Sequence, residues 1–330
     1  MRAAAILGLG CSPKYLKPFQ DDKAADKAID WRIGMPTPTD PVDVILLFGG
    51  DGTIHRHLGQ LVRLNVPVLV VPAGSGNDFA RALGLRRLHD SVAAWRRFRA
   101  THDNVRSIDL GLITPLESAG EAPSTIAQGR STPHEPARDA VHGARYFCCA
   151  AGVGLDGEVA RRANQLPRWL RAHGGYVMSL APAIFHFAPL PMKILTPKTE
   201  ADGQKPEVID GIWTIRSDQP TILAAFANTS TYGGGMKIAP HAKVDDGLLD
   251  VCIVGGIDPF KLFCMFPTVY FGRHLSMSEV DYFQSACLRV ETEHPLDVYA
   301  DGEYVCQTPV EVAVRRDVLR VIVHPSQTRF

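Results

Sequence analysis

The chain has 330 residues, which is enough for two domains with separate hydrophobic cores or for one large domain. Apolar residues make up 45% and charged residues 21%, which is the composition of an ordinary globular protein. Lys plus Arg and Asp plus Glu both number 35, and the resulting net charge of zero argues against a general nucleic-acid binder.

The first hundred residues alternate between apolar strands and amphipathic helices. We expect strands at 3–10, 42–49 and 66–72, and the second is almost continuously apolar, as central strands of a parallel sheet are. Apolar residues at helical spacing predict a helix after each of the last two strands, and a further short one near residue 90. The expected caps of the two later helices are Asn77 or Asp78, and Asp90 or Ser91.

From about residue 107 the pattern changes to short strands separated by turn residues, which predicts an antiparallel sheet or sandwich. Helical interruptions are expected near 156–186 and 258–275. The polar segment 115–143, rich in Pro, Ser and Gly, predicts a mobile loop. The expected strands are SIDLGLI, ARYFCCAAGVG, GIWTIRS, TILAAFAN, LLDVCIVG, ACLRVET, LDVYADG, VEVAVRR and LRVIVH.

These patterns predict two domains. Residues 1–106 form an α/β domain with a Rossmann-like parallel sheet, and residues 107–310 form a β-rich, sandwich-like domain.

Two glycine-rich loops directly follow neighbouring predicted strands: GGDGT at 49–53 and PAGSGND at 72–78. In a βαβ unit with the usual right-handed crossover, both loops lie at the edge of the sheet where ligands bind. Glycine lets backbone N–H groups approach an anion closely, and the following helices point their positive N-termini at the same place. Two ordinary βα turns are the alternative, but the repeated pattern with an acid in each loop favours a phosphate site. The pattern is neither a Walker loop nor GxGxxG.

GGDGT followed by GSGNDFAR resembles the catalytic domain of the diacylglycerol kinase family, which includes bacterial lipid kinases and the sphingosine and ceramide kinases. GGDGT alone is shared more widely, with NAD kinases and the phosphofructokinase superfamily. Three later segments resemble the bacterial lipid kinase pattern in the same order: AAGVGLDGEVARRAN (150–164), YGGGMKIAPHAKVDDGLLDV (232–251) and DGE (301–303). The resemblance covers roughly residues 40–325 and implies an ATP-dependent kinase that phosphorylates a lipid hydroxyl in a cleft between the two domains. It also implies that the last strand, at about 311–330, returns to the first domain.

The resemblance implies nucleotide-binding roles for both glycine loops. The residues expected against the nucleotide are Gly49, Gly50, Asp51, Gly52 and Thr53 of the first loop, and Gly74, Ser75, Gly76, Asn77 and Asp78 of the second. The chemistry agrees, because glycine N–H groups and the Thr53 hydroxyl suit phosphate oxygens and Asp51 suits magnesium or a hydroxyl. Ser75 stands where the family usually has Thr and keeps the hydroxyl.

The resemblance also implies a magnesium site in DDGLLD (245–250). Taken alone, this segment favours a hairpin turn, because Asp-Gly is a strong turn signal. The implied ligands are the Asp246 carboxylate and backbone oxygens near Lys243 and Leu248, a set of hard oxygen donors of the kind that magnesium prefers. The ion is either catalytic or structural.

The DGE segment supplies the implied catalytic base. Phosphoryl transfer needs positioning, magnesium and a group that accepts the proton of the attacking hydroxyl. We expect Glu303 or Asp301 to accept that proton, with Asp51 as the alternative.

Two features depart from the family pattern. The first strand continues into GLGCSPKY, where the family has an NPxxG-like phosphate loop, and Gly8, Gly10 and Ser12 stand in for that loop. His55 and Arg56 stand where the family has Asn-Glu. These departures keep two alternatives open: an NAD-kinase-like enzyme that acts on a soluble hydroxyl substrate, and a catalytically inactive regulator that binds nucleotide or lipid.

Two apolar, aromatic segments, 176–195 and 260–272, are candidates for lining an acyl-chain cavity, although most such residues form ordinary core. Six arginines but one acid lie between Arg81 and Arg99. They predict either a solvated helix face or a patch that meets an anionic membrane surface.

No apolar stretch is long and uninterrupted enough to predict a transmembrane helix, and the seven cysteines form no CxxC motif. We therefore expect a cytoplasmic enzyme that associates peripherally with a membrane, where its lipid substrate lies. Edge strands in the second domain allow a homodimer.

Overall fold

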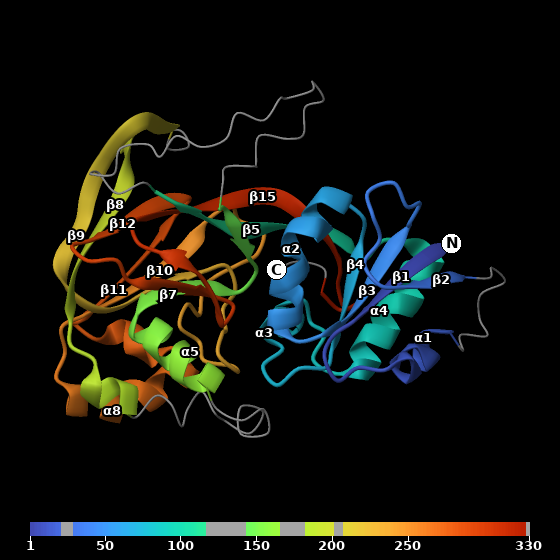
Figure 1. The fold of residues 1–330 in the computed structure, drawn as a ribbon, viewed down its shortest axis with the longest axis horizontal. Coiled ribbons are helices and arrows are strands. Elements are labelled where there is room, and N and C mark those ends of the chain that lie inside the picture. Colours follow the sequence, from blue (N-terminus) through green and yellow to red (C-terminus); the bar gives the residue numbers. More distant parts are fainter. Residues whose placement is uncertain (21–28, 117–142, 166–181, 201–206, 328–330) are drawn as a thin grey trace.

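The computed structural model describes residues 1–20, 29–116, 143–165, 182–200 and 207–327. The expected mobile loop at 115–143 therefore lies almost entirely outside the described residues, and so does the start of the apolar segment 176–195. Figure 1 shows an α/β lobe on the right and a β-rich lobe on the left, with β5 and β15 running between them along the top of the view.

The N-terminal lobe contains a parallel sheet with the strand order β4-β3-β1-β2. Its strands are β1 (Arg2–Leu7), β2 (Asp30–Ile33), β3 (Val44–Gly49) and β4 (Val68–Pro72). Its helices are η1 (Pro13–Leu16), α1 (Lys17–Gln20), α2 (Asp51–Leu64), α3 (Asp78–Ala82) and α4 (Leu88–Thr101). Strand β3 is buried along its whole length, which explains its continuous apolar sequence. The expected α/β class is confirmed; β2 was not expected, because its sequence DWRI is short and largely exposed.

The cap expected for the last helix of this lobe was wrong. Helix α4 begins at Leu88, and its N-cap is Arg87. The Asp90 carboxylate reaches back one turn and accepts a hydrogen bond from Arg87 N at 2.8 Å. Ser91 is buried and donates to Val70 O at 3.0 Å, so it ties the helix to strand β4.

The C-terminal lobe is built of antiparallel strands. They are β5 (Val105–Pro115), β6 (Arg145–Phe147), β7 (Ala150–Gly154), β8 (Leu190–Glu200), β9 (Glu207–Ala227), β10 (Leu249–Gly255), β11 (Val280–Ser285), β12 (Cys287–Thr292), β13 (Asp297–Ala300), β14 (Glu303–Gln307) and β15 (Val310–Ile322). The helical segments are α5 (Leu155–Gln165), α8 (Pro259–Met265), η2 (Phe266–Phe271) and η3 (Arg273–Ser276). The β-rich architecture is as expected.

Two pairs of expected strands are each one long strand. GIWTIRS and TILAAFAN both lie in β9, and VEVAVRR and LRVIVH both lie in β15. The residues between them, which had suggested turns, continue the strand and its pairing with neighbouring strands. Pro220 of β9 lies opposite Pro191 of β8. Asp317 has a left-handed backbone conformation, with a φ of 55°, at the irregularity in the pairing of β15 with β5.

Strand β15 couples the two lobes. Its first part pairs with β12 and β5 of the C-terminal lobe, and Val321 near its end pairs in parallel with Val68 of β4. Val321, Ile322 and Val323 pack into the N-terminal core. The last strand therefore contacts both lobes, while the division of the chain into domains stays a prediction.

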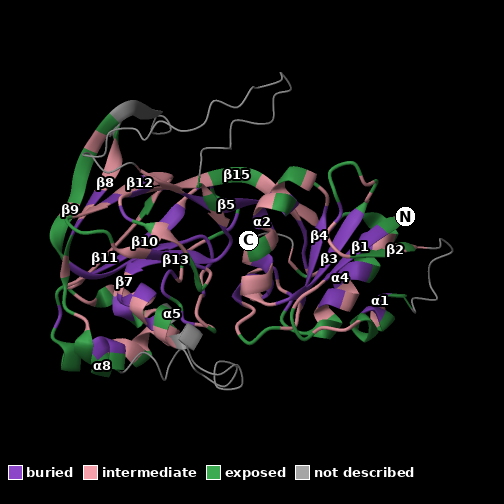
Figure 2. Cartoon of the chain, viewed as in Figure 1, coloured by how far each residue is buried: buried purple, intermediate pink, exposed green. Residues whose placement is uncertain are grey.

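The buried residues form three clusters, visible as purple segments inside both lobes in Figure 2. One lies around the parallel sheet of the N-terminal lobe and includes Cys148 and Cys149 from the other lobe. A second lies among strands of the C-terminal lobe, and a third lies between β9, β10 and the helical segments α5, α8, η2 and η3. In the part of the chain that the structure describes, no helix is both long and apolar enough to cross a membrane.

Candidate active site

The two glycine loops lie against each other at the carboxyl ends of β3 and β4. A Cβ atom added to Gly50 would lie 2.8 Å from Gly74 Cα, and one added to Gly74 would lie 2.5 Å from Gly50 Cα. Both distances are far below ordinary carbon–carbon contact, so only glycine fits at either position. A Cβ at Gly49 or at Gly8 would similarly lie within 2.8 Å of Thr53 Oγ1. Backbone from the ends of β1 and β3 thus lies close to the Thr53 hydroxyl.

Asn77 holds the second loop in shape. Its Oδ1 accepts a hydrogen bond from Gly74 N at 2.9 Å, and its Nδ2 donates to Gly74 O at 2.6 Å. Its φ of 56° is in the left-handed region, which Asn tolerates better than most residues. Asn77 does precede helix α3 as expected, but its side chain closes the loop and does not cap the helix.

Asp51 caps helix α3 from the first loop. Its carboxylate accepts hydrogen bonds from Asp78 N at 3.0 Å and Phe79 N at 3.1 Å. Burial and the neighbouring charge of Asp78 raise the pKa of Asp51 to about 6, although the two N–H groups oppose the shift. Asp78 is buried and Asp51 is partly buried, and two carboxylates this close at the N-termini of two helices are an arrangement that a bound cation would stabilise.

Asp78 connects the second loop to the C-terminal lobe. It is buried, its Oδ2 accepts a hydrogen bond from Gly234 N at 2.7 Å, and its other oxygen binds the Arg81 guanidinium. Gly76 lies beside the carboxylates of Asp51 and Asp78, since a Cβ at this position would be 2.8 Å from Asp51 Oδ2 and 3.6 Å from Asp78 Oδ2. The turn of YGGGM at 232–236 therefore touches the predicted nucleotide site.

Asp301 is anchored from both lobes. Its carboxylate accepts hydrogen bonds from the backbone N–H groups of Cys148 (2.9 Å), Cys149 (2.8 Å) and Ala150 (3.3 Å), and from His55 Nδ1 at 3.0 Å. Its side chain is fully buried and its φ is 51°, so it shapes the turn between β13 and β14. With its oxygens engaged in this way, Asp301 is better placed to hold the turn than to accept a substrate proton.

Glu303, the other candidate base, is exposed and faces the first glycine loop. A Cβ added to Gly52 would lie 2.9 Å from Glu303 Oε1. The side chain thus reaches from the C-terminal lobe to the first turn of α2, close to Asp51 and Thr53. This leaves a carboxylate free to act at the predicted phosphate site, and its role as base stays a prediction.

His55 is the site residue whose role sequence reasoning missed. It appears in the sequence only as a departure from the family pattern, but the structure places it opposite Asp301, with 11% of its side chain exposed. Burial lowers the pKa of His55 and so does Arg145, but the hydrogen bond and charge of Asp301, helped by Glu303, outweigh them. The pKa of His55 therefore lies above its ordinary value of 6.5.

This contact predicts a pH-dependent contribution of His55 to stability. Because the folded pKa is raised, the charged hydrogen bond is fully present below the unfolded pKa and is lost as pH rises through the folded pKa. In His55→Asn the amide Nδ2 keeps a neutral donor, so wild type should exceed it in stability by about 1 kcal/mol at low pH. Thermal unfolding of both proteins at several pH values between about pH 6 and about pH 9 measures this difference. A gap that stays constant or widens with pH would contradict the assignment.

The predicted magnesium ligands lie apart from these carboxylates, in the turn before β10. Asp246 and Lys243 are exposed, and Asp246 Oδ1 accepts a hydrogen bond from Leu248 N at 3.0 Å. Partial burial and the charges of Asp250, Asp109 and Asp245 raise the pKa of Asp246, against the opposing effect of that hydrogen bond. Carboxylate and carbonyl oxygens are the kind of donor that magnesium prefers, and the magnesium site at this turn stays a prediction.

Asp109 was not a sequence candidate, although it fixes this turn. It is buried, and its carboxylate accepts hydrogen bonds from Gly247 N at 2.7 Å and Asp317 N at 2.8 Å. Its partners lie 138 and 208 residues away, so no local pattern marks it.

Each of the two lobes matches a known protein family. Residues 27–113 match the family described as diacylglycerol kinase catalytic domain, and residues 149–323 match the YegS C-terminal NAD kinase beta sandwich-like domain. A diacylglycerol kinase of Mycobacterium tuberculosis (strain ATCC 25618 / H37Rv) is 29% identical over 286 residues, which is 85% of this chain and 76% of the relative. A putative lipid kinase, YtlR, of Bacillus subtilis (strain 168) is 25% identical over 84% of this chain and 79% of its own length.

Solved structures show the same fold. The crystal structure of a putative diacylglycerol kinase from Bacillus anthracis str. Sterne superposes with a TM-score of 0.65 over 98% of this chain and 95% of the other, at 20% identity. The catalytic-domain match makes the protein a phosphotransferase that acts on an alcohol group. This chain therefore belongs to the family of proteins with a YegS C-terminal NAD kinase beta sandwich-like domain, and its first lobe, with the paired glycine loops, matches the diacylglycerol kinase catalytic domain.

Proposed function

We propose that this protein is a lipid kinase that transfers the γ-phosphate of ATP to a hydroxyl group of diacylglycerol or a related lipid. The observation that carries the proposal is the turn at 232–236. Gly234 N in this turn donates to Asp78 of the second glycine loop, while Tyr232 and Met236 on either side line an apolar pocket. One short turn thus joins the predicted phosphate site to a place where a lipid chain can avoid water.

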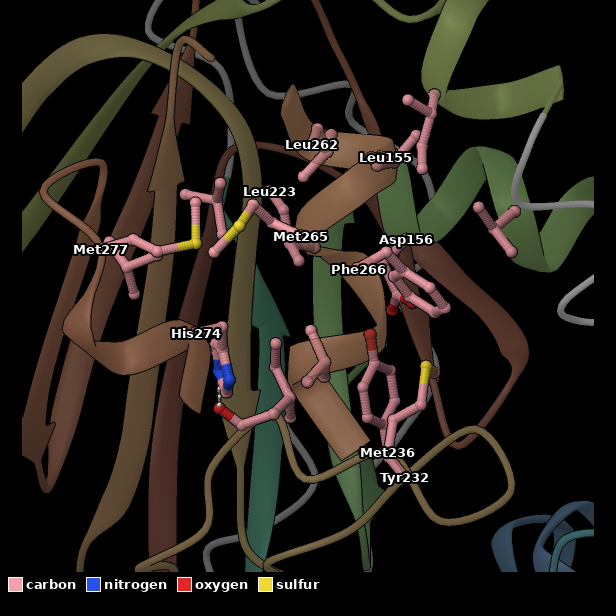
Figure 3. Close-up of a pocket in the computed structure, with 16 residues that line it drawn as sticks. Leu155, Asp156, Leu223, Tyr232, Met236, Leu262, Met265, Phe266, His274 and Met277 are labelled. Carbon is pink, nitrogen blue, oxygen red and sulfur yellow. Dashed lines mark hydrogen bonds between the residues drawn. The ribbon is translucent and has the colours of Figure 1, made fainter. Parts of the chain in front are cut away.

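The pocket lies in the C-terminal lobe, between strands β9 and β10 and the helical segments α5, α8, η2 and η3 (Figure 3). Both apolar segments singled out in the sequence contribute to it. The first supplies Ile184, and the second supplies Leu262, Met265, Phe266 and Val269. Such a concave, mostly apolar site with few polar groups is typical of small-molecule binding.

The proposed roles follow from the geometry of the site. The backbone N–H groups of the two glycine loops and the Thr53 hydroxyl bind the phosphates of ATP, and Glu303 accepts the proton of the lipid hydroxyl. Asp51 holds the helix N-terminus beside the phosphates. Magnesium, held by Asp246 with backbone oxygens of Lys243 and Leu248, supplies positive charge when bound.

Transfer of labelled γ-phosphate from ATP and magnesium to lipids in mixed micelles tests the proposal. The panel contains diacylglycerol, a sphingoid base, ceramide and phosphatidylglycerol, with NAD as the soluble acceptor. We expect one of the lipids to become labelled and NAD to stay unlabelled, because the pocket is apolar. Labelled NAD without labelled lipid would contradict the proposal, and ATP binding without any labelled acceptor would favour a regulatory protein.

We also propose that the protein associates peripherally with anionic membranes. Arg87, Arg96 and His89 line a groove between α1 and the start of α4, together with the exposed Leu88. On the other lobe, exposed aromatic rings lie on and next to α8, where Phe185 and Phe263 have centroids 5.7 Å apart. In Figure 1, α8 lies at the lower left of the C-terminal lobe and α4 lies in the N-terminal lobe between β3 and α1.

Reversing two charges in the groove should weaken binding to anionic liposomes. The variant Arg87→Glu with Arg96→Glu changes two residues that each contribute about 1 kcal/mol near such a surface, so binding at low salt should fall at least about tenfold. The matched control, Arg63→Glu with Arg315→Glu, makes the same change in net charge at exposed positions of α2 and β15. Liposome co-sedimentation in which both variants lose binding equally, or in which the groove variant binds normally, would remove this assignment.

A further inference from the structure

A buried histidine, His274, forms part of the wall of the apolar pocket. It lies in η3, only 3% of it is exposed, and its Nε2 is 3.0 Å from the backbone oxygen of Ile238 (Figure 3, dashed line). A carbonyl oxygen only accepts hydrogen bonds, so Nε2 must carry the proton and donate. Burial lowers the pKa of His274, and the hydrogen bond to Ile238 offsets only part of this effect. Because the pKa is lowered, the ring is neutral at physiological pH.

In the neutral ring with the proton on Nε2, the other nitrogen is a hydrogen-bond acceptor. That atom, His274 Nδ1, is buried and has no hydrogen-bond partner among the described residues. An acceptor left unpaired in an apolar interior is unfavourable, and buried polar groups in folded proteins are nearly always paired. His274 lines the pocket, so the structure contains an unused acceptor on one of the lining residues.

The rest of the lining limits what can satisfy this acceptor. Among the lining residues that the structure describes, only His274, Asp156 and Tyr232 have polar side chains, and the others are apolar. A buried water needs two to four polar partners, and this lining offers few. A hydroxyl group on an aliphatic chain needs only one acceptor, and the chain itself suits the apolar walls.

The size of the pocket is compatible with part of a chain. Its volume is about 70 Å³, roughly half that of an apolar cavity of ~150 Å³ that holds benzene. Met236, Met265 and Met277 lie in its wall, and such unbranched side chains adapt readily to a ligand. The cavity is thus small and is bounded by side chains that can move aside to admit a longer segment of chain.

We propose that this pocket binds the aliphatic chain of a lipid that carries a hydroxyl group, and that the hydroxyl donates a hydrogen bond to His274 Nδ1. The assignment rests on the proposed function and narrows it: among lipids with the same head group, the enzyme prefers those with a hydroxylated chain. His274 acts here as a specificity-determining residue, distinct from the groups at the phosphate site.

A matched pair of variants distinguishes the contribution of the donor nitrogen Nε2 from that of the acceptor nitrogen Nδ1. In His274→Gln the side-chain amide reaches the place of Nε2, so it keeps the donor to Ile238 and loses the acceptor. In His274→Asn the amide oxygen reaches the place of Nδ1, so the acceptor is kept and the donor to Ile238 is lost. A role in packing alone predicts the same ligand preference for both variants.

The decisive measurement is binding, independent of catalysis. Fatty acids of one chain length, each with a single hydroxyl at a different position, are titrated against the full-length protein and compared with the unsubstituted acid. We expect one position of the hydroxyl to raise affinity about tenfold in wild type, an effect that one hydrogen bond can supply. The preference should vanish in His274→Gln and persist in part in His274→Asn.

Equal binding of plain and hydroxylated chains to wild type would overturn the inference, and so would a preference that His274→Gln retains. The kinase assay is then run with diacylglycerols that bear the plain and the preferred chains. If both are phosphorylated equally, the inference fails while the proposed function stands. If neither is phosphorylated but the binding preference is present, the proposed function fails and the pocket assignment stands.

Discussion

Glu303→Gln should abolish most of the lipid phosphorylation while leaving ATP binding nearly unchanged. The Glu303 carboxylate lies opposite Gly52, within reach of the first turn of α2, and it is not engaged like that of Asp301. An amide of the same shape cannot accept the substrate proton, and a general base typically contributes about 10²–10⁴-fold to the rate. We therefore expect kcat to fall at least about 10²-fold, with a small change in KM for ATP.

Steady-state transfer of labelled phosphate to the preferred lipid, together with an ATP titration, checks this expectation. Glu293→Gln makes the same chemical change at an exposed position after β12 and should stay within about twofold of wild type. If Glu303→Gln retains full activity while Asp51→Asn loses it, the proton acceptor is Asp51 instead.

Gly74→Ala should separate the two glycine loops and weaken nucleotide binding. The new methyl group would lie 2.5 Å from Gly50 Cα and 3.1 Å from Asn77 Oδ1, and the nearer atom is backbone, which cannot rotate away. Overpacking of this kind costs roughly 1–3 kcal/mol, and the loops can relieve it only by moving apart. We expect a lower Tm and a loss of ATP affinity of about tenfold or more, because the N–H groups of the two loops would no longer point at the same phosphate oxygens.

The matched control is Gly59→Ala, on helix α2. A Cβ at Gly59 has Arg63 Nη1 at 3.9 Å as its closest neighbour, and the residue lies in the helix interior. Alanine there should stabilise the protein by about 0.5–1 kcal/mol and leave ATP binding unchanged. Thermal unfolding and titration with a fluorescent ATP analogue measure both effects. Equal ATP affinity in Gly74→Ala and wild type would exclude the close apposition of the loops as a requirement for binding.

Much of the N-terminal lobe could be predicted from the sequence. The strand at 44–49 is marked by an unbroken apolar run and the loop after it by glycines, and both signals depend on residues close together in the chain. The crossover rule then places the ends of neighbouring parallel strands at one edge. The signal was weaker where segments are short and exposed, as in β2, and where long strands bend, as in β9 and β15.

The contacts that complete the site could not be predicted in this way. His55 and Asp301 are 246 residues apart, and Asp78 and Gly234 are 156 residues apart. In the sequence, His55 is only an unusual residue after GGDGT, and Asp301 is part of an ordinary turn. Their pairing depends on how the two lobes pack, and so does the choice between Asp301 as an anchor and Glu303 as the free carboxylate.

The sequence by itself determined the α/β lobe, the two glycine loops at one edge of its sheet and the family to which they point, because local periodicity, turn chemistry and the handedness of crossovers act over short stretches of chain. Only the tertiary structure decided which carboxylates are engaged, how the turn at 232–236 joins the phosphate site to an apolar pocket, and that His274 keeps an unused acceptor in the wall of that pocket. Those features arise from packing between segments far apart in the sequence, where burial and hydrogen-bond partners are set by the whole fold.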